Sequence, residues 1–195
     1  MKKTLLLAGV ASLFAMNAQA VELTPYVGAD YNVNFLNRSS YWDNEVPGKY
    51  HSGSLVLGTK VSPYFAVEAF GELSKHATKK YWGDKAHTEY GAYGVDAFGI
   101  LPLGCYGEWE LLGTAGIGRY RYALKYGPKS VYGSEHYTFH MWGYRLGAGV
   151  QYNITENWGV RAMYRHIAFH NEKYQGEKLG LRGFDTFSVG VRYAF

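Results

Sequence analysis

The clearest pattern in the chain is a strict alternation of apolar and polar positions over residues 184–195. Successive side chains of a β-strand point to opposite faces, so a period of two residues is typical of a strand. The pattern therefore predicts a strand with one apolar and one polar face. Its apolar positions are Phe187, Val189, Val191, Tyr193 and Phe195, and the positions between them are Ser188, Gly190, Arg192 and Ala194.

Seven earlier segments repeat this alternation and are also predicted to be strands. They cover residues 23–35, 50–61, 65–74, 89–101, 109–122, 138–152 and 158–169. The connections alternate between long ones (37–49, 75–88, 123–137 and 170–183) and short ones (62–64, 102–107 and 153–157). Membrane barrels combine an even number of antiparallel strands with this alternation of loop lengths. We therefore predict an all-β, eight-stranded antiparallel up-and-down transmembrane β-barrel with both chain ends beside the short turns.

The polar faces of the predicted strands carry most of the chemistry. An eight-stranded barrel encloses an interior just wide enough for side chains, so charges there must find partners across the interior. We therefore favour a polar plug whose charged side chains pair with one another. The alternative is a narrow path for small ions. The charged residues on the inward faces are Asp30, Lys60, Glu68, Glu72, Asp96, Arg145, Arg161, Arg165 and Arg192.

The fifth predicted strand has an ambiguous parity. Its odd positions begin as an apolar face, with Leu111 and Ile117, and continue with Arg119 and Arg121. Either these arginines reach the lipid headgroups, or a β-bulge shifts the alternation so that they turn inward.

Composition agrees with a barrel and narrows the class of protein. Aromatic residues make up 17% of the chain and glycines number 25, yet the mean hydropathy is −0.25. A polar average with many aromatics is expected when lipid-facing and interior-facing residues alternate. No apolar run reaches about eighteen residues, so no transmembrane helix is predicted. A net charge of +4 is too small to indicate a nucleic-acid partner, and the single Cys105 allows no intrachain disulfide.

The first twenty residues have the three parts of a secretory signal peptide. A basic start, Met1-Lys2-Lys3, precedes an apolar segment over residues 4–16 and an Ala-x-Ala pattern that ends at Ala20. Such a segment is removed on export. We therefore expect residues 1–20 to be a cleaved signal peptide and residues 21–195 to form the barrel domain.

The end of the chain resembles the C-terminal signal of bacterial outer-membrane barrels, through Gly190, Tyr193 and the final Phe195. With the strand count and loop lengths, the whole of residues 21–195 resembles the small OmpA/OmpX-type barrels and the opacity or porin-family surface proteins. The resemblance implies a monomer in the outer membrane of a Gram-negative bacterium, with both termini in the periplasm. It also implies outer-membrane lipid, lipopolysaccharide and the barrel insertion machinery as partners. It indicates a fold and a compartment rather than an activity.

The long connections suggest contacts outside the cell. The second one is basic, and its lysines could pair with lipopolysaccharide phosphates. Aromatic and polar residues in the other loops suit recognition of a host or surface ligand, as in adhesion, although a plain solvated surface would have the same composition. The lysines are Lys75, Lys79, Lys80 and Lys85.

All seven histidines fall in the predicted outer loops or at the outer ends of strands. A tight turn over residues 153–157 predicts a register that sets Arg145 opposite Arg165 and His140 opposite His170. Two paired imidazoles could bind Zn²⁺ or Cu²⁺. Alternatively, the histidines gain a proton near pH 6.5 and then attract lipopolysaccharide phosphates. A third interpretation is that they are simply compatible with the partly hydrated membrane interface, as Tyr and Trp are. We expect no cofactor.

A lipid-modifying hydrolase would need a serine, a histidine and a carboxylate that converge. Ser134, Glu135 and His136 are consecutive, and neighbours in a strand point to opposite faces, so they cannot form a triad. The remaining candidates, which share the region of the first long connection, are Ser39, Ser40, Asp43 and His51. We therefore predict a protein that is not an enzyme, with a structural and surface-binding role through four loops. A narrow channel or porin is the second hypothesis and a lipid hydrolase the third.

Overall fold

The computed structural model describes residues 23–38, 48–74, 77–81, 84–104, 108–127, 135–170, 173–174, 177–178 and 181–195. Within these ranges, side chains are described except at residues 38, 77–81, 84–88, 122–127, 135–139, 173–174, 177–178 and 181–182. The expected signal peptide lies outside the described residues. None of the described segments is a helix of the length and hydropathy that would cross a membrane.

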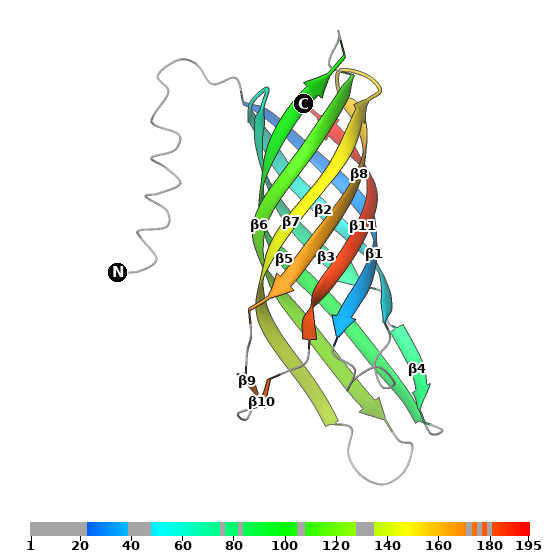
Figure 1. Ribbon diagram of the computed structural model, residues 1–195. Coiled ribbons are helices and arrows are strands. Elements are labelled where there is room, and N and C mark those ends of the chain that lie inside the picture. Colours follow the sequence, from blue (N-terminus) through cyan, green and yellow to red (C-terminus); the bar gives the residue numbers. More distant parts are fainter. Residues whose placement is uncertain are drawn as a thin grey trace.

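Eight long antiparallel strands form a closed barrel (Figure 1). The strands neighbour one another in the order β3-β2-β1-β11-β8-β7-β6-β5, and pairing of β3 with β5 closes the barrel. The predicted fold class is therefore confirmed. The long strands are β1 (Thr24–Arg38), β2 (Lys49–Ser62), β3 (Phe65–Ser74), β5 (Asp84–Leu103), β6 (Trp109–Gly127), β7 (Glu135–Asn153), β8 (Trp158–Phe169) and β11 (Leu181–Ala194).

Three short strands lie at the end of the barrel with the long connections. β4 (Ala77–Tyr81) pairs with the start of β5, and β9 (Lys173–Tyr174) pairs with β10 (Glu177–Lys178). The bounds of β3 and β8 agree with prediction, but β5, β6 and β7 extend into segments that were predicted to be loops. The β5–β6 ladder continues as far as Lys85 opposite Gly127. Backbone pairing there continues beyond the residues that alternate between apolar and polar. The alternation therefore underestimates the length of these strands.

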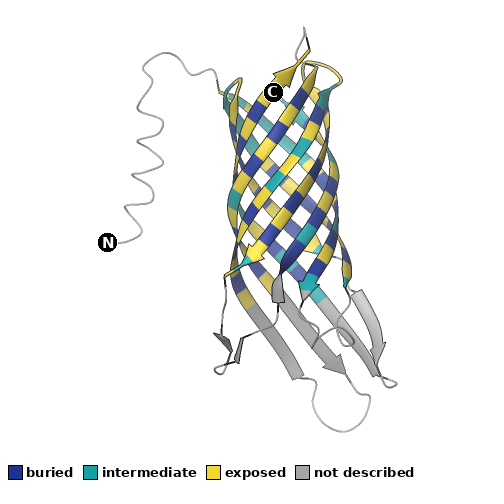
Figure 2. Ribbon diagram, viewed as in Figure 1, coloured by how far each residue is buried: buried dark blue, intermediate teal, exposed yellow. Residues whose placement is uncertain are grey.

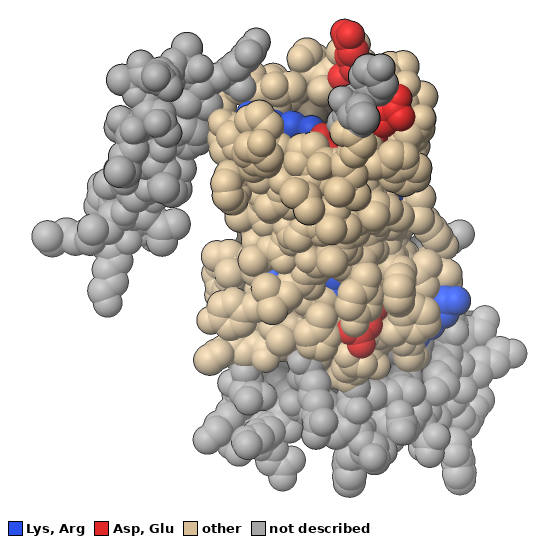
Figure 3. All heavy atoms as spheres, turned by 45° about the horizontal axis from the view of Figure 1, so that its top comes forward, with Lys and Arg blue, Asp and Glu red and all other residues tan. Residues whose placement is uncertain are grey.

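Buried and exposed residues alternate along every long strand (Figure 2). The exposed face is apolar, as Leu55 at 72% exposure illustrates. Figure 3 shows a wide belt without charged atoms around the middle of one face. Arg119 and Arg121 lie on this outward face, and the ladders on both sides of β6 run without a register shift. The ambiguity of the fifth predicted strand is thus resolved in favour of outward arginines, with no bulge.

Aromatic rings lie near both ends of the outward face, as expected where a barrel meets the two membrane surfaces. Beside the short turns, Trp109 contacts Tyr152 and Trp158 contacts Tyr193, with ring centroids 4.8 and 5.0 Å apart. Towards the other end, the Phe187 ring contacts Tyr164 and Phe35, with ring centroids 5.0 and 6.2 Å apart.

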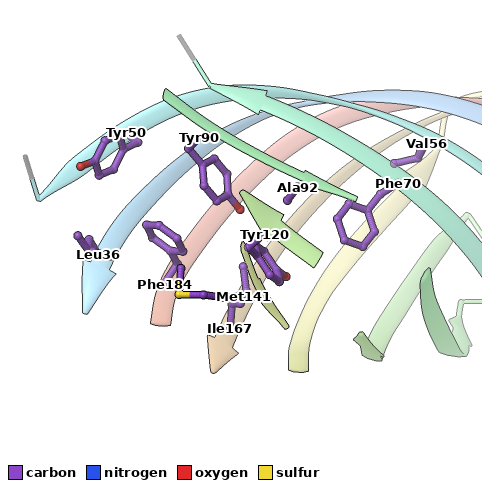
Figure 4. Close-up of a cluster of buried hydrophobic side chains, with 10 residues drawn as sticks. All are labelled: Leu36, Tyr50, Val56, Phe70, Tyr90, Ala92, Tyr120, Met141, Ile167 and Phe184. Atoms are coloured by element: carbon purple, nitrogen blue, oxygen red, sulfur yellow. The ribbon is translucent and has the colours of Figure 1, made fainter. Parts of the chain in front are cut away.

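Side chains fill the interior in layers. A large apolar cluster occupies the part nearer the long connections (Figure 4), and a smaller one lies nearer the short turns. Along β3, Ala66 belongs to the smaller cluster and Phe70 to the larger one, with buried Glu68 between them. The larger cluster comprises Leu36, Tyr50, Val56, Phe70, Tyr90, Ala92, Tyr120, Met141, Ile167 and Phe184.

Candidate functional site

Two arginine–carboxylate pairs form the centre of the barrel. Arg161 donates two hydrogen bonds of 2.9 Å to Glu68, which lies across the interior on β3. Arg192 donates two of 2.8 Å to Asp30 on the neighbouring β1. Contacts of 3.7 Å from Arg161 to Asp30 and from Arg192 to Glu68 join the pairs into one four-charge network. Bidentate pairs of this kind are strong because the two parallel N–H groups of the planar guanidinium match the two oxygens of a carboxylate.

A glycine makes room for the Asp30 carboxylate. Asp30 on β1 faces Gly190 on β11 in the ladder, and a Cβ at position 190 would overlap Asp30 Oδ1. The same arrangement occurs on the other side of the barrel, where Asp96 faces Gly116 and a Cβ at 116 would overlap Asp96 Oδ1. Gly190, which the sequence analysis assigned to an assembly signal, therefore also has a packing role in the charged interior.

A second charged group surrounds Asp96. Its carboxylate lies 3.3 Å from Arg145 and 3.9 Å from Arg165, and the Arg145 guanidinium stacks 3.6 Å from the centre of the Phe70 ring. Arg165 also donates to the Ser188 hydroxyl at 2.9 Å. More of its buried polar atoms lack hydrogen-bond partners than in the central network. Both Asp96 oxygens, two Arg145 nitrogens and Arg165 Nε are buried without a hydrogen-bond partner among the described residues.

Glu72 is bound by neutral groups rather than by an arginine. It accepts hydrogen bonds from the Ser52 hydroxyl at 2.5 Å and from the Asn34 amide at 3.1 Å. The sequence analysis expected Glu68, Glu72 and Asp96 to balance Arg145 and Arg165. Of the three acids, Asp96 is the one that contacts both of these arginines.

The third charged group lies near the short turns and includes a residue that the sequence analysis missed. Glu110 binds Lys60 at 2.6 Å and accepts hydrogen bonds from the side-chain amides of Gln151 and Asn153. The alternation over 109–122 already assigned even-numbered residues to the polar face, so a signal for Glu110 was available. Figure 3 shows basic atoms next to acidic ones at this end.

A cavity of about 490 Å³ lies at this end, with Lys60 and Glu110 in its lining and Arg161 and Arg192 among its walls. In the middle of the barrel the space is far smaller. The cavity bordered by Asp30, Glu68, Glu72, Arg145 and Arg165 measures about 10 Å³. Such a volume holds roughly one water molecule. The described interior therefore narrows from an open vestibule to a filled middle.

All nine residues predicted to face the interior do so: eight are buried, and Lys60 is half-buried. The described inward charges balance, because the same number of acids and bases is present. The acids are Asp30, Glu68, Glu72, Asp96 and Glu110, and the bases are Lys60, Arg145, Arg161, Arg165 and Arg192.

The predicted register between β7 and β8 is wrong by two residues. Arg145 faces Ile167, and Arg165 faces Gly147. The ladder ends at Asn153 opposite Gly159, so the loop between paired residues is wider than the predicted register allows. Within it, the backbone N–H groups of Ile154 and Thr155 both donate to the Trp158 carbonyl. The Thr155 hydroxyl also accepts from the N–H groups of Asn157 and Trp158, which stabilises this wider loop.

The wrong register removes the predicted pairing of His140 with His170. His140 faces Arg121 on β6, and the His170 N–H donates to the Trp142 carbonyl. No group of three metal-binding side chains occurs within the described part of the chain. The cross-strand pair proposed for Zn²⁺ or Cu²⁺ is thus not formed.

Two other outer histidines have partners of their own. His51 Nδ1 lies 2.6 Å from the Tyr31 hydroxyl, and His166 Nδ1 lies 2.7 Å from Asp185. Asp185 also accepts hydrogen bonds from the Tyr164 hydroxyl and the Asn37 amide.

Several predicted contact residues lie outside what the structure describes. The side chains of Lys75, Lys79, Lys80 and Lys85 are among them, as are Ser39, Ser40, Asp43 and Ser134. At the other end, the Tyr193 ring contacts Phe195 at 5.3 Å, and the Phe195 N–H donates to the Pro25 carbonyl. These contacts fasten the last residues of the chain to the start of β1.

Comparison with known families identifies the chain. The family described as "Outer membrane protein beta-barrel domain" matches residues 5–195. The chain belongs to this outer-membrane β-barrel family. No curated protein sequence matches it. Membership assigns the protein to the bacterial outer membrane and confirms the family resemblance seen in the sequence.

Several solved outer-membrane proteins share this barrel. Neisserial surface protein A is 18% identical, with a TM-score of 0.63 and coverage of 88% of this chain and 97% of that one. Ail, the attachment invasion locus protein of Yersinia pestis, is 16% identical, with a TM-score of 0.57 and coverage of 88% and 98%. A major outer membrane protein of Thermus thermophilus is 11% identical, with a TM-score of 0.64 and coverage of 89% and 100%. At these identities the likeness shows the fold.

Proposed function

We propose that this outer-membrane barrel is a closed scaffold that displays four long connections at the cell surface for binding. The observation that supports a closed scaffold is the filled middle of the barrel, where the cavity between described side chains measures about 10 Å³. A hydrated ion needs far more room, and the interior charges already neutralise one another. In this proposal the long connections face the outside and both termini lie in the periplasm, as in other barrels with short periplasmic turns.

The ligand class that we propose is a polyanion, either a surface glycan or the phosphates of lipopolysaccharide. Ail of Yersinia pestis, which shares the fold, has been solved in complex with the heparin analogue sucrose octasulfate. In the present chain, four lysines of the second long connection, Lys75, Lys79, Lys80 and Lys85, provide positive charge for such a ligand. Their pairing with sulfate or phosphate groups would be strongly salt-dependent.

Binding of a fluorescent sucrose octasulfate conjugate to cells that display the barrel tests this proposal. Replacing the four lysines with glutamine should abolish binding at physiological salt, whereas Lys49→Gln at the barrel wall should leave it unchanged. Equal binding by the wild type and the four-lysine variant would contradict the proposal.

A narrow ion path is the second candidate. It is favoured by the poorly satisfied group around Asp96, Arg145 and Arg165, which lies beyond the vestibule near the short turns. Single-channel recording on refolded protein separates the candidates. The closed scaffold predicts a silent bilayer, and discrete openings by the wild type would favour the path.

We also propose that the barrel is not an enzyme. Among the described side chains, the outward pair of His166 and Asp185 is engaged by Tyr164 and Asn37 rather than by a serine. A nucleophile activated by this pair would have to lie within hydrogen-bond reach of the histidine. Release of acyl chains from labelled lipid A by the purified barrel would contradict this part of the proposal.

A further inference from the structure

Two arginines interrupt the apolar outer wall of the barrel. On β6 the outward positions Ala115 and Ile117 are followed by Arg119 and Arg121, nearer the long connections, and both arginines are exposed. Charged side chains on a lipid-facing barrel wall are costly near the bilayer midplane and cost little near the interface. Their place at the end of the apolar band therefore puts the guanidinium groups at headgroup level.

Neighbouring strands surround these arginines with groups suited to a lipid headgroup. Arg119 is flanked in the ladders by Tyr93 on β5 and Trp142 on β7, which are 60% and 53% exposed. Arg121 is flanked by Gly91 and by the exposed His140. Directly opposed residues have Cβ atoms about 4.5–5.5 Å apart, so the imidazole and the guanidinium can reach one ligand.

Neither arginine is neutralised by a described side chain. Throughout the part of the chain with described side chains, no carboxylate forms an ion pair with Arg119 or Arg121. Glu89 is the acid on the same face of β5, but it lies opposite Ala123 and has an interaction of its own. The contrast with the interior is clear, because each of the four inward arginines contacts a carboxylate.

We propose that Arg119, Arg121 and His140 bind the phosphate of a membrane lipid in the leaflet at the long-connection end. The Cα atoms of alternate residues in a strand lie about 7 Å apart, so two long arginine side chains there can converge on one phosphate. Arginine binds phosphate through two parallel hydrogen bonds. Tyr93 and Trp142 would contact the uncharged part of the headgroup, as interfacial aromatics do.

The site is confined to one side of the barrel. At the same end, the wall made by β8 and β11 carries Asp185, whose carboxylate is engaged by His166, Tyr164 and Asn37. A carboxylate there would repel a phosphate. The assignment rests on the proposed function only for the statement that this leaflet is the outer one, and it does not involve the long connections.

Lipid binding to the purified barrel tests the site. The barrel is placed in phosphatidylcholine nanodiscs doped with lipid A, and retained lipid A is counted by native mass spectrometry. The double variant Arg119→Gln/Arg121→Gln should bind at least about tenfold more weakly, since it loses the charge-assisted hydrogen bonds to the phosphate. Arg119→Lys/Arg121→Lys keeps the charge and should fall between the two, which also provides a readout if the glutamine variant folds poorly.

Two controls make the test specific to this site. Lys49→Gln removes an exposed cation from another part of the wall, where it lies over the Phe35 ring, and should leave lipid A binding unchanged. Lipid A without phosphates should bind to the wild type as weakly as normal lipid A binds to the double variant. Equal retention by wild type and double variant, or an equal loss in Lys49→Gln, would overturn the site. Sucrose octasulfate binding by the same variants would stay intact, which separates this result from failure of the proposed loop function.

Discussion

The central charge network makes a quantitative prediction about Arg161. Replacing it with methionine removes two 2.9 Å hydrogen bonds to Glu68 and the 3.7 Å contact to Asp30, and leaves two buried carboxylates with Arg192 alone. Removing one partner of a buried ion pair costs about 3–5 kcal/mol, because the other charge stays desolvated. We therefore expect Arg161→Met to lower the free energy of unfolding by about 3–5 kcal/mol.

A second substitution should restore most of that loss. Glu68→Gln in the Arg161→Met background removes the uncompensated charge and keeps an acceptor for the Tyr26 hydroxyl, which donates to Glu68 at 3.2 Å. Replacing both members of a buried pair by neutral groups of similar volume is often close to neutral. The double variant should thus be more stable than Arg161→Met alone, and the double-mutant cycle should give a coupling free energy of at least about 2 kcal/mol.

Urea unfolding of the barrel in bilayers of defined composition measures these free energies. Lys49→Met is the control, since it removes an exposed cation from the outer wall, outside the site proposed for lipid, and should change stability by less than about 1 kcal/mol. A loss below about 1 kcal/mol in Arg161→Met, or a double variant that is less stable than the single one, would refute the assignment of a charge-paired interior.

Three further predictions concern packing, assembly and closure. Gly190→Ala should destabilise the barrel by about 1–3 kcal/mol because the new methyl group overlaps the Asp30 carboxylate, whereas Gly71→Ala, with no atom within 4 Å of the new Cβ, should be nearly neutral in the same urea titration. Deleting Phe195 should reduce outer-membrane yield in cell fractionation by weakening the closing strand, and an unchanged yield would argue against an assembly role. Arg145→Ala should raise single-channel conductance above the silent wild type by emptying space beside Phe70, and a silent variant would argue against a seal at that level.

The sequence predicted which side chains turn inward because alternation alone determines the face of a strand. It assigned Glu68 and Arg161 correctly to the interior, but it could not pair them, because β3 and β8 are not neighbours and their distance depends on how the barrel closes. The register of β7 with β8 failed for a local reason. The Thr155 side chain stabilises a wider loop than the residue count suggests.

The limits of strands were hardest to predict outside the apolar band. β6 was expected to end at residue 122 but continues to Gly127, since an antiparallel ladder needs only backbone hydrogen bonds once the strand leaves the membrane. At Arg119 and Arg121 the sequence suggested a possible irregularity that the structure does not have. Their interruption of the apolar pattern left a bulge as one of two possibilities, whereas the ladder is regular and both side chains face outward.

Every residue of the large apolar cluster and of the central charge network lies on a strand. Within the proposed function, the barrel wall therefore maintains the permeability barrier without help from the long connections. Insertions or substitutions in those connections would alter what the cell displays without opening a leak for solutes. Such a division of labour would let the exposed surface diversify rapidly, for instance under immune or phage selection, on a barrel that hardly changes.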